Sequence, residues 1–389
     1  MTWLLALILA PLSLLTLFLA VELFVGLRPI RHRAIPIKDG ATAVIVVPAH
    51  DEAEIIAVSL AALKAAADDA RILVVADNCT DRTAETARRL GFEVIERFDA
   101  ERRGKGFALD FARAHIRGVK PDVVVILDAD CASDARSIAN LIARCALTGR
   151  PCQAVNLQYP NVGGSPAVQL STFAFFIKNV IRQRALQRLA GRTHLLGTGM
   201  ALPWPIFDGA RLATDNIVED LQLGIELAAA GHGPLFVEEA SVWSNAETEK
   251  STLAQRRRWE GGFLQSALSA APEAFRRSLG EGDLRGLWAA INLLIPPLAL
   301  LVLLDVAALV LALAFAWFGS ADKWPPVVLG GSLLLACIGL ALAWDAGGRR
   351  FVTLSAIARI PLYVLWKLPM YVGLARGGAP KDWIRTRGG

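Results

Sequence analysis

One stretch of the chain reads Val123-Val124-Val125-Ile126-Leu127-Asp128-Ala129-Asp130-Cys131. Its apolar half predicts a β-strand buried on both faces, because such strands appear as continuous runs of β-branched residues. Asp128 and Asp130 stand at alternate positions where the strand runs out, so both carboxylates can turn toward a ligand in the loop. Hard oxygen ligands of this kind suit Mg²⁺ or Mn²⁺. The rival interpretation is a strand end with two solvated aspartates, since the pattern is common.

Strands alternate with helices on the amino-terminal side of this stretch, from about residue 42 to about residue 121. Apolar runs that read as strands begin near Ala43, Arg71 and Phe92, and Gly104-Lys105-Gly106 opens the last helix. This alternation predicts an α/β fold with a mainly parallel sheet and right-handed crossovers. Ligands of such sheets bind beyond the carboxyl ends of the strands.

Polar clusters stand where three of these strands end. They are His50-Asp51-Glu52, Asp77-Asn78 and the pair Asp128 and Asp130. Any one of them reads equally well as a solvated loop. Because the carboxyl ends of parallel strands meet at one edge of the sheet, the three together predict a shared nucleotide site.

Composition indicates a membrane protein. The chain has 389 residues, of which 54% are hydrophobic, and its mean hydropathy is +0.43; both are high for a soluble enzyme. The net charge of +5 suits an anionic membrane surface, and no nucleic-acid motif or nucleic-acid partner is indicated. The five cysteines lack metal-site or disulfide spacing, so we expect reduced thiols in the cytosol.

Apolar runs at both ends of the chain predict its membrane segments. The predicted domains are a transmembrane helix over residues 1–27, a cytosolic domain over 40–265 that includes interfacial helices, a membrane region over 285–375, and a basic cytosolic tail over 376–389. The membrane region is expected to hold two spans, at Leu287–Phe318 and Pro326–Ala343. A third apolar stretch, Phe351–Leu374, carries basic residues within and around it, so we expect an interfacial or re-entrant segment.

Basic residues set the predicted orientation of the first span. Arg28, Arg31, His32, Arg33 and Lys38 follow it at once. By the positive-inside rule they place the domain after it in the cytoplasm.

Three further segments have two interpretations each. Residues 165–192 form an aromatic and basic helix that lies either in the membrane interface or packed on the sheet. Glu219 and Asp220 open a helix, where acidic residues either complement the helix dipole or serve a site. Gln255, Arg258 and Trp259 share one helix face, which is either solvated or suited to phosphate and stacking.

In this order, four motifs resemble those of the membrane-bound family 2 glycosyltransferases, the class of cellulose, chitin, hyaluronan and poly-N-acetylglucosamine synthases. The motifs are Asp77 at the second strand end, the D-x-D of Asp128 and Asp130, the pair Glu219-Asp220, and the Q-x-x-R-W of Gln255, Arg258 and Trp259. Each is common alone, whereas the ordered set is specific. The resemblance covers most of residues 40–265.

The resemblance implies a GT-A fold, flanked here by amino- and carboxyl-terminal transmembrane helices. It also implies transfer of a sugar, with inversion, from a nucleoside diphosphate sugar and most simply a UDP-sugar. The implied residue roles are catalysis by Asp220 with Glu219, metal binding by Asp130, and donor binding by His50, Glu52, Asp77, Lys105, Asp128, Gln255, Arg258 and Trp259. The implied cofactor is Mg²⁺ or Mn²⁺.

Several partners follow from the same resemblance. The acceptor is expected to be a glycan or a lipid-linked molecule at the cytoplasmic face of a bacterial inner membrane, in exopolysaccharide or cell-surface polysaccharide synthesis. Membrane lipids and other polysaccharide assembly proteins are the expected neighbours. The competing hypothesis is a non-catalytic membrane subunit that senses nucleotides for a polysaccharide synthesis or export machine.

Overall fold

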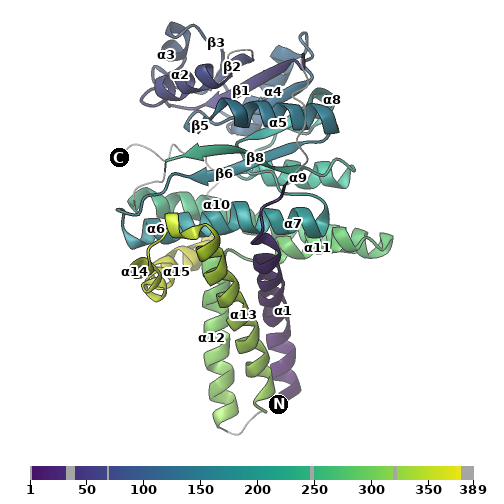
Figure 1. Cartoon of the computed structure of the whole chain (residues 1–389), viewed down its shortest axis with the longest axis vertical. Helices are drawn as coiled ribbons and strands as arrows, with labels where there is room; N and C mark the ends of the chain where they lie inside the picture. The colour runs from purple at the N-terminus through teal and green to yellow at the C-terminus, as the bar shows by residue number, and fades with distance from the viewer. Residues whose placement is uncertain (1, 32–39, 68–69, 246–248, 319–321, 378–389) are drawn as a thin grey trace. The chain divides into compact units, whose positions relative to one another are not determined.

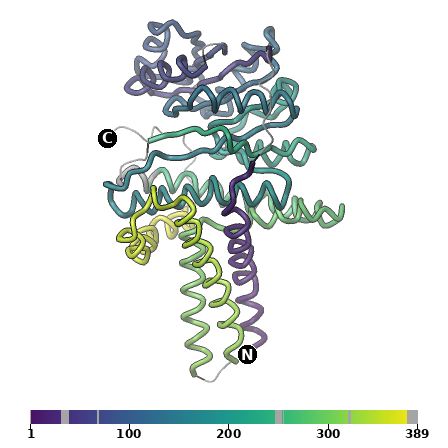
Figure 2. Tube along the Cα trace, in the orientation of Figure 1, coloured from purple at the N-terminus to yellow at the C-terminus, as the bar shows by residue number. Residues whose placement is uncertain are grey.

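A computed structural model of the chain describes residues 2–31, 40–67, 70–245, 249–318 and 322–377 (Figures 1 and 2). Its described residues form two compact units, which we call the sheet unit and the helical unit. The sheet unit lies within Pro29–Tyr159 and Gly191–Glu247, and the helical unit within Met1–Arg28, Pro160–Ala190 and Thr248–Gly378. The predicted basic residues His32, Arg33 and Lys38, and the tail from residue 378 on, lie outside the described residues.

The sheet unit is built on a single mixed sheet, with the strand order β3-β2-β1-β4-β7-β6-β8-β5. The strands are β1 (Ala43–Ala49), β2 (Arg71–Asp77), β3 (Glu93–Arg97), β4 (Val123–Ile126), β5 (Cys131–Ser133), β6 (Cys152–Gln158), β7 (Met200–Pro203) and β8 (Leu235–Ser244). Strands β1 to β4 pair in parallel, as the sequence predicts. β7 pairs antiparallel with both β4 and β6, and β5 pairs antiparallel with β8.

Helices cover both faces of this sheet. They are α2 (Ile56–Ala66), α3 (Thr83–Arg89), α4 (Lys105–Ile116), α5 (Ala135–Thr148), α8 (Trp204–Gly209) and α9 (Glu219–Ala229). Successive side chains of a strand point to opposite faces. Ile45 and Val47 therefore enter the core formed with α2 and α5, while Val44 and Val46 enter the core formed with α4 and α9. Strands buried on both faces explain the unbroken apolar runs.

The helical unit contains the apolar ends of the chain. Its helices are α1 (Thr2–Gly26), α6 (Pro166–Phe176), the π-helical turn η1 (Ile177–Ile181), α7 (Arg182–Ala190), α10 (Glu249–Glu281), α11 (Leu284–Leu294), α12 (Leu298–Trp317), α13 (Trp324–Ala346), the 3-10 turn η2 (Gly348–Arg350), α14 (Leu354–Ile357) and α15 (Ile360–Gly377). Of the described helices, α1, α12 and α13 are long and apolar enough to cross a membrane.

These three helices run side by side in Figure 1 and pack on one another. At one end of the bundle the Asp322 N–H donates to the Thr2 hydroxyl over 3.0 Å. The rings of Trp3 and Trp324 meet at the same end, with centroids 6.0 Å apart. The start of α1 and the start of α13 therefore lie together.

The predicted span Leu287–Phe318 differs from the structure, which divides it into α11 and α12. Pro296 and Pro297 lie between the two helices. Proline has no N–H to donate and disfavours helical backbone at the residue before it. Ile295 accordingly has a ψ of 111°, which ends α11. Of the two helices only α12 is a candidate span.

The aromatic helix predicted over residues 165–192 is α6, η1 and α7. Most of its apolar side chains, Phe175 and Phe176 among them, are buried. Within the helical unit Phe176 stacks on Phe351 and Phe175 lies against Trp259. The last apolar stretch forms α14 and α15, and α15 is not a candidate span. Its interfacial placement stays a prediction.

Candidate functional site

The D-x-D pair lies where β4 ends, as the sequence predicts. β4 stops at Ile126, and the Asp128 N–H donates to the Thr198 hydroxyl over 3.0 Å. One ligand atom each from Asp128, Asp130 and Cys131 lies within 4.8 Å of the others. The turn after β4 thus directs both carboxylates into one small volume.

This donor set fits a hard divalent cation. Burial, and then the Asp130 carboxylate, hold the pKa of the Cys131 thiol well above its usual range. The thiol is therefore neutral, and the Cys131 Sγ–H donates to Asp130 Oδ1 over 3.3 Å. Two carboxylates remain as ligands, which suits Mg²⁺ or Mn²⁺ completed by water and phosphate oxygens.

Lys105 lies beside this pair, at the first turn of α4. Its ammonium contacts Asp128 Oδ1 and donates to the Gly197 carbonyl over 2.7 Å. Gly104 before it has a φ of +135°, a conformation that requires glycine. A Cβ on Gly106 would lie 2.4 Å from the Leu212 carbonyl oxygen, so this position also accepts only glycine. The Gly-Lys-Gly sequence is therefore what seats the lysine at the site.

Burial raises the pKa of the Asp128 carboxyl, and the Lys105 ammonium opposes that rise. Buried carboxylates are costly unless a cation compensates them. Among the described residues that cation is Lys105. Its single positive charge faces two carboxyl groups, which leaves room for the charge of a bound divalent cation.

Glu219 and Asp220 open α9 and reach the same group. A Cβ built on Gly197 would lie 3.3 Å from Asp220 Oδ2 and 3.9 Å from Lys105 Nζ, so both side chains border this glycine. Burial, and then the charge of Asp220, raise the pKa of Glu219 to about 8. Glu219 is therefore mostly protonated at neutral pH, and we infer that these acids do more than complement the helix dipole.

The ends of β1 and β2 are tied together. His50 Nδ1 donates to the Asp77 carbonyl over 2.7 Å, and the Glu52 N–H donates to the Thr83 hydroxyl over 2.8 Å. The Asp77 side chain is fully buried and its Oδ1 accepts from Arg97 over 2.7 Å. Arg97, at the end of β3, was not expected from the sequence, where nothing marks a lone arginine after a short strand.

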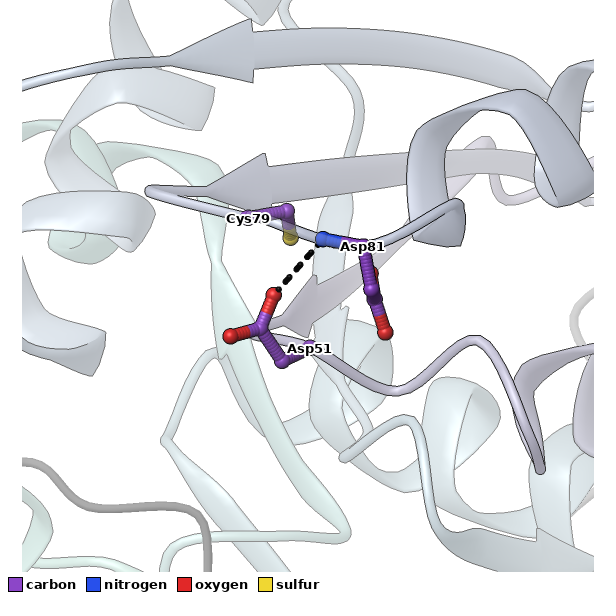
Figure 3. A group of neighbouring side chains, drawn as sticks. All are labelled: Asp51, Cys79 and Asp81. Atoms are coloured by element: carbon purple, nitrogen blue, oxygen red, sulfur yellow. Dashed lines mark hydrogen bonds between the residues drawn. The ribbon is translucent and has the colours of Figure 1, made fainter.

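Asp51, Cys79 and Asp81 form a second acidic cluster in the same loops (Figure 3). The Asp51 carboxylate accepts from the backbone N–H groups of Thr80 and Asp81, over 2.6 and 3.2 Å. Asp81 in turn accepts from the N–H groups of Ala53 and Thr83. These bonds use the carboxylate oxygens to fix the loops after β1 and β2, so the cluster acts as a structural tie.

Gln255, Arg258 and Trp259 lie on α10 as predicted, in the helical unit. Gln255 is buried, whereas Arg258 and Trp259 are partly exposed. The Trp259 ring lies 5.8 Å from the Phe175 ring and 5.4 Å from the Arg256 guanidinium. Of the predicted site residues, Lys105, the pairs Asp128/Asp130 and Glu219/Asp220, and the residues of the β1 and β2 loops lie in the sheet unit. The Q-x-x-R-W residues lie in the helical unit.

A comparison with known protein families identifies the family of this chain. The family described as "Glycosyltransferase like family 2" matches residues 40–262, more than half of the chain. The chain belongs to this family. The match covers the β1, β2 and β4 strand ends, the acidic pair of α9 and the Q-x-x-R-W residues of α10.

Similar proteins agree with the family. The low-salt glycan biosynthesis hexosyltransferase Agl6 of Haloferax volcanii is 37% identical over 101 residues, which are 25% of this chain and 23% of that protein. The chain therefore matches about a quarter of that curated relative's length.

Two solved structures are similar. The mannosyltransferase PcManGT of Pyrobaculum calidifontis, solved with GDP-Man and Mn²⁺, is 18% identical, with a TM-score of 0.55 over 95% of this chain and 94% of that one. Glucosyl-3-phosphoglycerate synthase of Mycobacterium tuberculosis, solved with Mn²⁺, UDP and phosphoglyceric acid, is also 18% identical, with a TM-score of 0.40 over 60% of this chain and 84% of that one. Together with the family match, the first likeness identifies the GT-A fold, as expected from the motifs.

Proposed function

We propose that this family 2 chain is a membrane-bound, inverting glycosyltransferase. It moves a sugar from a nucleoside diphosphate sugar to a hydroxyl of a glycan or lipid-linked acceptor. The observation that carries the proposal is one group of charges: Lys105 between Asp128 and the Gly197 carbonyl, with Asp220 of α9 bordering the same glycine. Breaking a sugar–phosphate bond needs cationic charge on one side and a base on the other.

Asp130 is the proposed metal ligand, with Asp128 beside the nucleotide and sugar. When bound, Mg²⁺ or Mn²⁺ supplies positive charge for the diphosphate that leaves. The Mn²⁺ in the structure of PcManGT supports this choice of ion. Lys105 adds a fixed positive charge in the sheet unit, and we assign Arg258 of α10 to donor binding.

Asp220 is the proposed base. As the acceptor oxygen bonds to the anomeric carbon, the bond from that carbon to the phosphate oxygen breaks, the proton passes to Asp220, and the electron pair leaves on the diphosphate. Glu219, whose pKa is raised to about 8, stays protonated and can donate a hydrogen bond. We assign the base to Asp220, which borders Gly197 beside the Lys105 ammonium. Attack opposite the leaving group inverts the anomeric centre.

Asp77 is proposed to read the donor base. Its Oδ1 already accepts from Arg97 and Asn78, while its Oδ2 is buried with no hydrogen-bond partner among the described residues. Such an oxygen is costly to leave unpaired, so a ligand N–H would satisfy it once the loop admits the base. A single free oxygen suits the one ring N–H of uracil better than the paired donors of guanine, which favours UDP-sugars. We assign His50 and Glu52 to the loop that lines the base.

The remaining donor contacts are assigned to α10. We assign the partly exposed Trp259 ring as an apolar platform for a sugar. Gln255 shares its helix face and completes the contact.

The same proposal includes the cellular setting. Three helices able to cross a membrane support an integral membrane protein, with the domain over 40–265 at the cytoplasmic face of the bacterial inner membrane. The membrane region over 285–375 and the basic tail over 376–389 would contact membrane lipids. We assign the reaction to exopolysaccharide or cell-surface polysaccharide synthesis, beside other assembly proteins.

A donor screen tests the function. The full chain in membranes is given UDP- and GDP-hexoses with Mn²⁺, and nucleotide release and product size are measured together. We expect release of UDP with growth of a glycan or lipid product. If nucleotide binds without release for every donor and acceptor fraction, the chain is the nucleotide-sensing subunit instead.

A further inference from the structure

Glu260 follows Trp259 directly on α10, and α15 binds both oxygens of its carboxylate. The Lys367 ammonium contacts Oε1, and the Tyr371 hydroxyl donates to Oε2 over 2.8 Å. The Lys367 side chain is only 2% exposed and that of Glu260 13%. The ammonium also lies 5.3 Å from the Tyr371 ring, a favourable cation–π distance. A buried carboxylate with a partner at each oxygen thus joins α10 and α15 within the helical unit.

Arg256 binds α6 from the same face of α10. Its Nε donates to the Ser171 hydroxyl over 2.8 Å, and its Nη2 donates to the Ser171 carbonyl over 3.0 Å. Residues four apart on a helix lie on one face, so Arg256 and Glu260 form a single gripped face. α10 is therefore held on this face by α6 at one residue and by α15 at the other.

This grip fixes the direction of Arg258. Arg258 is two residues from both Arg256 and Glu260, and each residue turns a helix by about 100°. Its side chain therefore leaves α10 about 200° around the axis from both gripped residues, on the opposite side. Any rotation of α10 that loosened the grip would turn Arg258 by the same angle.

This buried ion pair is not expected to add much to the free energy of unfolding. Desolvation of two charges offsets much of their attraction, and apolar replacements of a buried pair are often neutral or stabilising. A carboxylate bound at both oxygens, however, tolerates little rotation of the helix that carries it. The contacts of Lys367 and Tyr371 therefore suit the role of fixing the rotation of α10 better than that of stabilising the fold.

We propose that Lys367 and Tyr371 are positioning residues, which set the rotation of α10 through Glu260 and so orient Arg258, the residue to which we assign donor binding. The inference rests on the proposed function of Arg258. It adds two residues of α15, over a hundred positions later in the chain, to the machinery of transfer.

The test is the double variant Glu260→Gln with Lys367→Met, measured in the full chain in lipid nanodiscs. Both replacements are neutral and similar in size, so the thermal midpoint should stay within about 2 °C of wild type, or rise. The kcat of transfer should fall about tenfold or more with the donor KM changed less than about twofold, since small misplacements of a catalytic charge are costly. A stable double variant that transfers at the wild-type rate would overturn the proposal.

A matched control lies on the same helix. Glu273 and Arg277 form an exposed pair on α10, with side chains 71% and 45% exposed. The double variant Glu273→Gln with Arg277→Met makes the same chemical change where no orientation is set. We expect unchanged kcat, KM and thermal midpoint, and a loss of kcat equal to that of the buried pair would count against the proposal.

Two further measurements keep the inference testable if the first variant folds poorly or no donor is found. Tyr371→Phe removes one hydroxyl and should lower kcat about threefold or more at constant KM; wild-type kcat would contradict the proposal. Amide hydrogen exchange over residues 255–263 needs no activity. Exchange should quicken about tenfold in Tyr371→Phe and in the Glu260→Gln, Lys367→Met variant, because local order there depends on the contacts of Glu260 with α15. Exchange in α12 should not change. Unchanged exchange overturns the positioning role, whereas an inactive wild type overturns only the proposed function.

Discussion

At the scale of single residues, Glu219 and Asp220 are chain neighbours with different chemistry. Burial and the neighbouring charge raise the pKa of Glu219 to about 8. Asp220 borders Gly197 beside the Lys105 ammonium. A base must be ionised and close to the proton that it accepts. The surroundings thus favour Asp220 as base and Glu219 as its neutral partner.

Replacement of Asp220 by Asn tests that assignment. Asp220→Asn keeps size and hydrogen bonding but cannot accept the proton, so transfer should fall by roughly two to four orders of magnitude. Donor affinity, read by titration with UDP-sugar, should hardly change. Glu226→Gln on the same helix is the control and should transfer at the wild-type rate. Transfer by Asp220→Asn within about threefold of wild type would make Glu219 the next candidate.

Glu93 carries a pH dependence away from the site. Hydrogen bonds from Arg71 lower the pKa of Glu93 to about 2, against a usual value of 4.5. The native state therefore releases this proton more readily than the unfolded state, and stability rises with pH over this range. The contribution should be complete above about pH 4.5 and lost as the pH falls toward 2.

Thermal midpoints of Glu93→Gln measure this contribution. The variant should melt below wild type at pH 7, and the gap should narrow at pH 3. Glu85→Gln breaks an exposed pair with Arg89 and should shift the midpoint little at either pH. A gap that is equal at both values would mean that the charge of Glu93 contributes nothing.

At the scale of elements, the sequence predicts the boundaries that local chemistry sets. The β4 end at Ile126, the α4 start at Lys105 and the α9 start near Glu219 follow from apolar runs, glycines and acidic first turns. The break between α11 and α12 was available from Pro296 and Pro297, but the apolar content of the stretch favoured a single span. The π-helical turn η1 leaves no such mark, because tertiary packing decides it.

The packing of α13 on α1 gives a prediction at this scale. A Cβ on Gly339 would lie 2.8 Å from the Leu23 Cβ, whereas a Cβ on Gly331 of the same helix would meet nothing within 4 Å. Gly339→Ala should therefore destabilise the helical unit by about 1–3 kcal/mol. Gly331→Ala should be neutral or slightly stabilising, since alanine favours helix. Equal thermal midpoints for the two variants would contradict this packing.

At the scale of the whole molecule, the pairs that join distant segments were beyond sequence reasoning. Lys367 and Glu260 are 107 residues apart, and Arg182 meets Glu22 across 160 residues. Periodicity and motifs report local structure and the edge where a site forms, but not which buried charges will pair. The sheet edge where the candidate site lies was therefore predictable from its motifs, whereas the pairing of these buried charges was not.

Topology is a property of the whole chain that the helical unit makes testable. Thr2 and Asp322 lie at one end of the bundle, and Arg28, Arg31, Arg349 and Arg350 follow the opposite ends of α1 and α13. By the positive-inside rule we predict that the Thr2 end lies outside the cytoplasm. In a cysteine-free background, Thr2→Cys and Lys323→Cys should react with an impermeant reagent in intact cells. Arg28→Cys should react only after lysis, and the reverse pattern would invert the topology.

Metal-dependent sugar transfer tests the central claim most directly. The full chain in membranes is incubated with labelled UDP-hexoses and Mn²⁺, and label is counted in the glycan and lipid fractions for wild type and for Asp130→Ala. Wild type should incorporate label, and a chelator should stop it. Asp130→Ala should keep the wild-type thermal midpoint yet lose incorporation at every Mn²⁺ concentration, because the ion has lost its ligand. Incorporation by Asp130→Ala at the wild-type rate, with the same metal dependence, would contradict the account.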